Sequence, residues 1–393
     1  MKILVVSHTY IVDLNCEKLR SLVQIDPTVE VTVVVPKRWS PGGVQNRVVV
    51  SEAKDEGRFR VLPLSNLSNN NQSLLSFGLD FLKLLKEFQP DIIQVEQGSK
   101  SLGYAESIFL NKILKLNAKN VFFTWWNLPY STKFPISWLE RYNLQNTHGL
   151  IVGNQDGADI VEDHGYSSPV CVMPQLGVDE ELFRPTDQAQ LALSHGINPD
   201  DFVIGFVGRF VPEKGLAILL KAIAHLKTEI DVQKPWKLML LGRGPYKATL
   251  QEMATKLDIE AHILWIESVS HEQVPDYINL MDTLVLPSMT TYDVSTLTAV
   301  GWKEQFGHVL IEAMACQVPV IGSDSGEIPN VIKEDGLVVP EGDPIALADS
   351  IHLLMNNPQQ RQAIAEQGRI RAMAEYTNTA LAKRQLEFYQ SLF

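Results

Sequence analysis

The chain has 393 residues, and its 46 Asp and Glu residues outnumber its 34 Lys and Arg residues, which gives a net charge of −12. This acidic balance excludes the general basic surface that nucleic-acid binding needs, so we expect no nucleic-acid partner. Hydrophobic residues make up 45% of the chain. No apolar run, however, reaches the ~18 residues that a membrane span needs.

The N-terminal residues and the cysteines indicate the compartment. Met1 and Lys2 lead straight into a strand-like run instead of a signal peptide, so we expect a soluble, cytoplasmic protein. The cysteines Cys16, Cys171 and Cys316 lie far apart in apolar or strand-like surroundings. We therefore expect buried thiols and neither a disulfide framework nor a zinc site.

Short β-branched runs alternate with helix-period segments along the whole chain, a pattern typical of parallel sheets with crossover helices. Most runs are apolar without alternation, as expected for strands covered on both faces. In the first half the predicted strands are Lys2–Ser7, Val29–Pro36, Phe59–Leu64, Asp91–Glu96, Val121–Trp126, Leu150–Asn154 and Val170–Pro174. In the second half they are Phe202–Gly208, Lys237–Gly242, His262–Ile266, Thr283–Pro287, Val318–Gly322 and Leu337–Pro340.

This alternation predicts an α/β fold of two doubly wound domains. The apolar rhythm lapses in a Pro- and Asp-containing stretch, which we interpret as a linker at 185–201. It separates a first domain at 1–184 from a second at 202–374. The last segment, 375–393, has an apolar face that needs a partner, and we expect it to pack back on the first domain. Ligands collect at the carboxyl ends of parallel strands, so the cleft between two facing domains is the expected site.

The strongest signal in the second half is the string Gly301–Cys316, which lies between two predicted strands. Its apolar residues recur at helical spacing, so a helix is predicted to begin near Phe306 and Gly307. The free amides at that end suit a diphosphate. Glu304 precedes the helix and Glu312 lies two turns into it, roughly 12 Å away along the axis. Carboxylates accept hydrogen bonds from hydroxyls, so Glu312 is expected to hold a ribose and Glu304 the transferred sugar.

These glutamates resemble the E-x7-E motif of retaining glycosyltransferases, specifically glycosyltransferase family four, whose members have the GT-B fold. The likeness covers nearly the whole second half. It implies two Rossmann-like domains facing a central cleft, the first binding the acceptor and the second the nucleotide sugar. It also implies transfer of a hexose-type sugar from a UDP- or GDP-sugar to a saccharide or other hydroxyl acceptor. Such reactions belong to polysaccharide, glycolipid or glycoconjugate biosynthesis.

The resemblance extends to a second loop and assigns further donor contacts. The segment Gly205–Gly215 resembles the family's G-R-x-x-x-x-K-G phosphate loop. Arg209 and Lys214 are then expected to neutralise the leaving diphosphate and, with Glu304, to carry the reaction. The other expected donor contacts, besides Glu312, are Gly208, Phe306, Gly307, His308 and Val309.

The family needs no metal or other cofactor, and the chain lacks the Asp-x-Asp pair of metal-dependent sugar transferases. We therefore expect transfer without a metal. The resemblance also implies retention at the anomeric carbon. Since no carboxylate is evident as a nucleophile, we favour departure of the diphosphate and attack by the acceptor on the same face, with the leaving oxygen taking the proton.

The first half matches the family less well. Family members often carry a Gly-Gly pair in the loop after the first strand, which here reads Ser7-His8-Thr9-Tyr10-Ile11-Val12, and Trp126 stands where relatives often have a His. The acceptor-side candidates are therefore His8, Glu96 and Asn127, for each of which a purely structural role is equally open. A helical face of Lys112, Lys115 and Lys119 also lies in this half. We expect from it, at most, weak peripheral contact with the inner face of a membrane.

Two other functions were weighed against sugar transfer. A nicotinamide-dependent oxidoreductase would need the dinucleotide fingerprint, and the G-x-G start at Gly242 and Gly244 fails because Lys247 stands at the third glycine position. A catalytically inactive protein that binds nucleotide sugars or acts as a scaffold is the remaining alternative. The presence of Glu304, Glu312, Arg209 and Lys214 argues against it.

Overall fold

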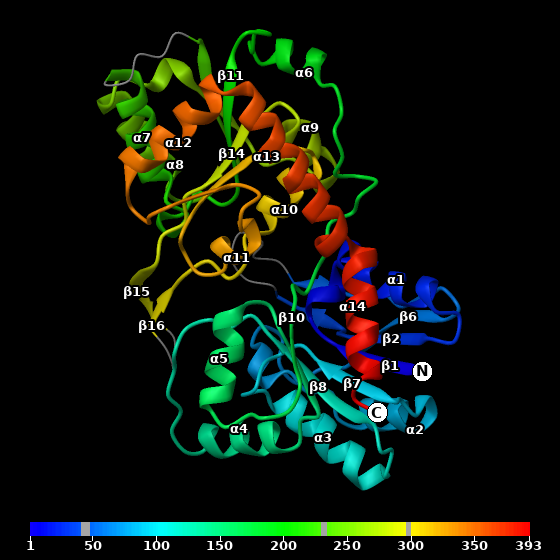
Figure 1. The fold of residues 1–393 in the computed structure, drawn as a ribbon. Helices are drawn as coiled ribbons and strands as arrows, with labels where there is room; N and C mark the ends of the chain where they lie inside the picture. The colour runs from blue at the N-terminus through cyan, green and yellow to red at the C-terminus, as the bar shows by residue number, and fades with distance from the viewer. Residues whose placement is uncertain (41–47, 229–233, 296–299) are drawn as a thin grey trace. The chain divides into compact units, whose positions relative to one another are not determined.

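The computed structural model describes residues 1–40, 48–228, 234–295 and 300–393, and it divides into two compact units. Unit 1 contains the described residues of Met1–Gly177 together with Asn378–Phe393. Unit 2 contains the described residues between Val178 and Thr377. Figure 1 colours the elements of both units along the chain, and each unit is a sheet with helices on its faces.

Unit 1 is built on an eight-stranded sheet with the order β10-β9-β8-β7-β1-β2-β6-β5. All neighbouring strands are parallel except β5, which pairs antiparallel with β6 at the edge. The strands are β1 (Lys2–Val6), β2 (Glu30–Pro36), β5 (Lys54–Asp55), β6 (Phe59–Leu64), β7 (Ile92–Val95), β8 (Lys119–Thr124), β9 (Gly149–Val152) and β10 (Val170–Val172). A separate antiparallel pair joins β3 (Arg38–Trp39) to β4 (Val49–Val50).

The helices of unit 1 cover both faces of this sheet, because its strands are apolar on both sides. Along β1, Ile3 and Val5 enter one buried cluster and Leu4 and Val6 enter the other. Each such side chain stabilises the fold by roughly 1.5–3 kcal/mol when fully buried. The helices are α1 (Glu17–Ile25), α2 (Leu79–Phe88), α3 (Leu102–Leu114), α4 (Ile136–Gln145), α5 (Gln155–Asp163) and α14 (Asn378–Gln390), with 3-10 turns at Thr9–Ile11, Asp13–Cys16 and Gln72–Leu74.

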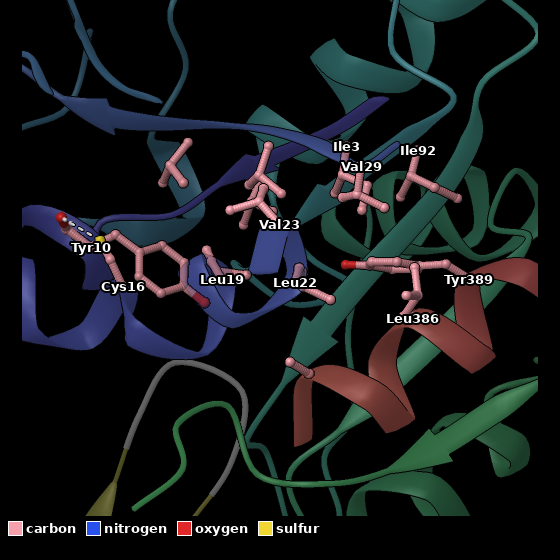
Figure 2. Packing of buried hydrophobic residues seen from close by; sticks show 14 of the residues in the cluster. Ile3, Tyr10, Cys16, Leu19, Leu22, Val23, Val29, Ile92, Leu386 and Tyr389 are labelled. Carbon is pink, nitrogen blue, oxygen red and sulfur yellow. Dashed lines mark hydrogen bonds between the residues drawn. The ribbon is translucent and has the colours of Figure 1, made fainter. Parts of the chain in front are cut away.

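The C-terminal helix α14 completes the core of unit 1, as the sequence predicted. Leu386 and Tyr389 of α14 lie in the same buried cluster as Leu22 of α1 (Figure 2). Phe388 and Leu392 pack against this cluster from its margin. The apolar face of the last segment is therefore buried against the first 177 residues of the chain.

Unit 2 has a six-stranded parallel sheet with the order β13-β12-β11-β14-β17-β18. Its strands are β11 (Phe202–Val207), β12 (Trp236–Leu241), β13 (Ile263–Ile266), β14 (Thr283–Leu286), β17 (Val320–Ser323) and β18 (Leu337–Val339). An antiparallel hairpin of β15 (Thr291–Ser295) and β16 (Val300–Trp302) leaves the sheet after β14.

The helices of unit 2 alternate with these strands along the chain. They are α6 (Ala189–Ser194), α7 (Leu216–Thr228), α8 (Lys247–Lys256), α9 (Val274–Ile278), α10 (His308–Ala315), α11 (Ile328–Ile332), α12 (Pro344–Asn356) and α13 (Pro358–Arg371). Shorter 3-10 turns occur at Pro212–Lys214, Glu260–His262 and His271–Gln273, and a π-helical turn at Ala372–Tyr376 follows α13.

The predicted α/β class and the two doubly wound sheets are confirmed, and every strand predicted from an apolar run is present. One local prediction is wrong. The helix α3 ends at Leu114, Lys115 adopts a left-handed conformation with φ of 53°, and Lys119 begins β8. Lys112, Lys115 and Lys119 therefore do not share a helical face. Among the described residues, no helix combines the length and the apolar character of a membrane span.

Candidate functional site

The sheet of unit 2 has its topological switch point between β11 and β14, where the chain order changes direction. Ligands of doubly wound sheets bind outside the carboxyl ends of the strands at such a point. The loop after β11 carries Arg209 and Lys214, and Ser288 follows β14. The predicted phosphate loop therefore lies at the expected edge of the sheet.

A close approach of two backbones positions Lys214. Gly215 has φ of 68°, and a Cβ atom there would lie 1.7 Å from the carbonyl oxygen of Pro287. A residue with a side chain would be strained and would collide with the end of β14. The amide of Met289 also donates to the carbonyl of Glu213 over 2.8 Å. The loop after β11 is thus fixed directly against the end of β14.

Glu304, Lys214 and Ser288 form a buried cluster at this point. The Nζ of Lys214 donates to Oε2 of Glu304, and the Oγ of Ser288 donates to the same oxygen over 2.7 Å. Only 8% of the Glu304 side chain and 16% of the Lys214 side chain are exposed, so the pair is held away from bulk water. Lys214 also lies 5.2 Å from the ring centroid of Trp302 on the hairpin. The structure therefore brings together two of the three residues expected to carry the reaction.

The N-terminus of α10 begins beside this cluster. Gly307 is the N-cap of the helix with φ of 85°, and as a glycine it has no side chain that could cap the first amides. A Cβ atom at Gly307 would lie 2.8 Å from Cδ2 of Leu286. The preceding Phe306 is buried, with its ring 5.7 Å from that of Tyr376. The uncapped amides of the first turn are suited to an anion.

His308, in the first turn of α10, is held as a neutral imidazole. Burial lowers the pKa of His308 to about 4, while the charge of Glu304 acts to raise it and that of Lys214 to lower it. A neutral imidazole can donate one hydrogen bond without bringing a charge to the site. Val309, the next residue, is partly buried in the same turn.

Glu312 lies one helical turn after His308, on the same face of α10. Its side chain is partly buried, and burial alone raises the pKa of its carboxyl to about 7. Within the part of the chain that the structure describes, its carboxylate makes no hydrogen bond or ion pair. An acceptor of this kind is suited to a ligand that brings its own hydroxyl donors.

Arg209 is the most open charge of the loop after β11. Its side chain is 58% exposed, and its Nη2 lies 3.9 Å from Oε1 of Glu213, a distance at which an exposed ion pair contributes little. Gly208, which precedes it, packs so closely that a Cβ atom on Gly242 would lie 1.9 Å from the Gly208 carbonyl. The guanidinium therefore extends from a rigid turn.

The three acceptor-side candidates lie in unit 1 in different surroundings. Both carboxylate oxygens of Glu96 accept hydrogen bonds: Oε1 from Tyr10 and Gln94, and Oε2 from Gln175. Asn127 is 3% exposed. His8 is partly buried, and its Nδ1 has no hydrogen-bond partner among the described residues.

Sequence reasoning missed two polar residues of these edges. These residues are Ser288, after β14, and Gln175, after β10. Their position in the sequence could have indicated a role, since each follows the carboxyl end of a parallel strand by two or three residues. As for metals, no group of three or more His, Cys, Asp or Glu side chains suited to an ion occurs in the described ranges.

The sequence of the second unit matches a known protein family. Residues 187–371 match the sequence model of the family described as glycosyl transferases group 1. The chain is 29% identical over 194 residues to N-acetyl-alpha-D-glucosaminyl L-malate synthase of Bacillus anthracis, covering 49% of this chain and 46% of that protein. It is 30% identical over 200 residues to the GDP-mannose-dependent alpha-(1-6)-phosphatidylinositol monomannoside mannosyltransferase of Mycolicibacterium smegmatis, with 49% of each chain covered. The matches thus span about half the length of these curated relatives.

Solved structures resemble the whole chain at lower identity. HepE of Anabaena in complex with UDP superimposes with a TM-score of 0.72 at 17% identity, covering 100% of both chains. Sucrose-phosphate synthase of Thermosynechococcus elongatus superimposes with a TM-score of 0.70 at 19% identity, covering 100% of this chain and 99% of that one. Identities this low establish the fold alone, and that fold is GT-B.

Proposed function

Because residues 187–371 of this chain match the family of glycosyl transferases group 1, we propose that it is a glycosyltransferase. It moves a hexose-type sugar from a nucleotide-diphosphate donor, bound by unit 2, to a hydroxyl of an acceptor, bound by unit 1. One observation carries the proposal. Lys214, Glu304 and Ser288 meet at the switch point of unit 2, beside the uncapped first turn of α10.

The donor-side roles follow from the chemistry of each group. Lys214 and Arg209 stabilise the negative charge that develops on the leaving diphosphate, helped by the amides of the first turn of α10. Glu312 accepts hydrogen bonds from the ribose hydroxyls, which supply the donors that its carboxylate otherwise lacks. Glu304, which Lys214 and Ser288 hold in place through Oε2, contacts the transferred sugar.

The reaction that these roles support proceeds with retention and without a metal. The bond between the anomeric carbon and the phosphate oxygen breaks, and the acceptor oxygen attacks the same face. The leaving phosphate oxygen takes the proton of the acceptor hydroxyl, so that no further base is required. Charge stabilisation by fixed groups is the largest contribution, and each such donor is typically worth about 10²–10³ in rate.

The relatives suggest which donors to test first. One is named for its dependence on GDP-mannose, and HepE was solved with UDP. We therefore propose a UDP- or GDP-sugar as the donor and a saccharide or other hydroxyl compound, in polysaccharide, glycolipid or glycoconjugate synthesis, as the acceptor.

We propose that the protein works in the cytoplasm. We also propose that its contact with a membrane is at most weak. Around Lys112 of α3, the side chains of Phe109, Ile113 and Trp138 are exposed by 55, 57 and 63%. Each lysine near an anionic bilayer adds about 1 kcal/mol at most, so binding should be sensitive to salt. Sedimentation with anionic liposomes tests this, and strong binding at physiological salt would contradict it.

The proposed function is tested by nucleotide binding followed by product analysis. Thermal shift with UDP, GDP and NAD should show stabilisation by UDP or GDP. The matching sugar nucleotide is then incubated with methyl hexopyranosides and with saccharides from cell extracts, and products are identified by mass spectrometry. Stabilisation by NAD alone, or binding of a sugar nucleotide without any transfer or hydrolysis, would contradict a glycosyltransferase.

A further inference from the structure

The polar side chains at the carboxyl edge of unit 1 converge on a single amide. The Nε2 of Gln175 donates to Oε2 of Glu96 over 2.5 Å and to Oγ1 of Thr9 over 3.2 Å. Its Oε1 accepts a hydrogen bond from Nε1 of Trp125 over 3.0 Å. These residues follow β10, β7, β1 and β8, so Gln175 joins the ends of four strands.

Glu96 holds the same loop from its other oxygen. The hydroxyl of Tyr10 and the Nε2 of Gln94 donate to Oε1 of Glu96 over 2.9 and 2.8 Å. The 3-10 turn Thr9–Ile11 is therefore fixed twice, through the side chains of Thr9 and Tyr10. Glu96 is 5% exposed, and both its oxygens are engaged. It is suited to positioning this turn and not to contact with a ligand.

The indole of Trp125 reaches Gln175 because the neighbouring strand leaves space for it. A Cβ atom on Gly153 would lie 1.9 Å from Cε3 of Trp125. Gly153 follows β9, so a glycine at this strand end is what admits the ring. We call the cluster of Gln175, Glu96, Thr9, Tyr10 and Trp125 the frame of unit 1. It depends on packing as well as on hydrogen bonds.

The residue that this frame presents is His8, which directly precedes the fixed turn. Its ring lies 4.9 Å from that of Trp39, and its Nδ1 is buried without a hydrogen-bond partner among the described residues. Burial lowers the pKa of His8 to about 4, so the ring is neutral near pH 7. A buried polar atom without a partner destabilises the protein, and a hydrogen bond to a ligand hydroxyl can offset that cost. His8 also stands at the switch point between β1 and β7.

We propose that Gln175 is a positioning residue for the acceptor side, and that it sets the imidazole of His8 against a hydroxyl of the acceptor. The inference rests on the proposed function, since it assigns the acceptor to unit 1. It selects His8 from the three candidates, because Glu96 is engaged and Asn127 is enclosed.

The first test measures the His8 ring directly by NMR titration, with His8→Gln used for assignment. Gln175→Leu should release the turn and raise the pKa of His8 by at least about one unit toward its ordinary value. Gln385→Leu is the matched control, because Gln385 is also buried in unit 1, and its hydrogen bonds within the described residues go to Gln94 and Tyr389. An unchanged His8 titration in Gln175→Leu, or an equal shift in the control, would overturn the positioning role.

The second test separates acceptor from donor. With UDP-glucose or GDP-mannose and the saccharide acceptor found by product analysis, Gln175→Leu and His8→Ala should each raise the acceptor KM at least about tenfold. The Kd for UDP or GDP should stay within about twofold, because unit 2 is untouched. The double variant should lose little more than either single variant, since Gln175 acts through His8.

The outcomes distinguish this inference from the proposed function. Additive losses in the double variant, or a nucleotide Kd that changes as much as the acceptor KM, would contradict the link from Gln175 through His8 to the acceptor. If no acceptor yields a product with the wild-type protein, the proposed function fails together with the acceptor half of the inference. The His8 titration still decides the positioning half.

Discussion

The two units share one topology but use their charged side chains differently at the switch point. In unit 2, Glu312 has no protein partner among the described residues and Arg209 is mostly exposed. In unit 1, the carboxylate of Glu96 is closed off by three hydrogen bonds from within the unit. Unpaired charge suits a diphosphate with its sugar and ribose, whereas an internally satisfied frame suits a neutral polyol held by a few fixed groups.

A second carboxylate in unit 1 repeats this pattern. Glu140 of α4 is 4% exposed and accepts hydrogen bonds from Ser99 over 2.8 Å and from Thr132 over 3.1 Å, as well as from Tyr130. These partners belong to the loops after β7 and β8. Acidic side chains at this edge therefore hold loops in place, whereas Glu312 of unit 2 makes no hydrogen bond or ion pair within the described residues.

The sharpest way to break this contrast is to remove the central cation of unit 2. Lys214→Ala should lower the rate of donor turnover by about 10²–10³, because it removes charge from the leaving group and leaves Glu304 buried without its ion pair. Steady-state kinetics measure the loss. Lys227→Ala is the control, since Lys227 pairs with Asp258 on the surface of the same unit. A comparable loss in both variants would contradict the assignment.

Two further substitutions test the open charges. Arg209→Ala and Glu312→Ala should each lower donor turnover at least about tenfold, a loss of ~1.4 kcal/mol in transition-state binding. Arg184→Ala provides the control for Arg209, because Arg184 is an exposed arginine at the start of the same unit. Turnover near the wild-type rate in a folded Arg209 or Glu312 variant would remove that residue from the site.

The pH dependence of binding tests the comparison further, because the Glu312 carboxyl of unit 2 has a pKa near neutrality. The pKa of Glu312 is raised to about 7 by burial, and only the ionised form accepts hydrogen bonds from both ribose hydroxyls. The affinity for a sugar nucleotide should therefore rise about tenfold from pH 6 to pH 8, as the ionised fraction grows.

The raised pKa of Glu312 makes the stability of the fold depend on pH in the opposite direction from the affinity for the sugar nucleotide. A carboxyl whose pKa is raised on folding stabilises the protein below its ordinary pKa, and this contribution is lost as pH rises toward 7.

The pH dependence of sugar-nucleotide binding is measured by calorimetric titration of the wild-type protein and of Glu312→Gln. A pH dependence that survives in Glu312→Gln would assign it to another group.

The smallest expected effect concerns the frame of unit 1. Tyr10→Phe removes one hydrogen bond to Glu96 and should lower the free energy of unfolding by about 1 kcal/mol. The affinity for the nucleotide should not change, because Tyr10 lies in unit 1. Chemical denaturation measures the loss of stability, and nucleotide titration measures the affinity. Weaker nucleotide binding in Tyr10→Phe would contradict the assignment of the nucleotide to unit 2.

The sequence predicted the candidate site residues of unit 2 better than those of unit 1. Its motif residues lie close together along the chain, since Glu304, Gly307 and Glu312 fall within one loop and one helix. Apolar runs such as Leu150–Asn154 likewise predicted their strands, because burial on both faces leaves no polar alternation.

The frame of unit 1 was not predictable in the same way. Gln175 and Thr9 are 166 residues apart, and only the pairing of parallel strands brings them together. The lysine face failed for a local reason, since Lys115 takes a left-handed cap that helical periodicity does not reveal. Long-range polar contacts and helix ends therefore set the limit of sequence reasoning here.

The most direct test of the account is the product formed in EDTA, analysed by proton NMR as soon as it appears. Metal-free chemistry, with Lys214, Arg209 and the amides of α10 stabilising the diphosphate, predicts a glycoside with the same anomeric configuration as the donor. An inverted product would contradict attack on the face that the diphosphate leaves. A strict need for Mg²⁺ or Mn²⁺ would show that these protein groups do not supply the stabilisation assigned to them.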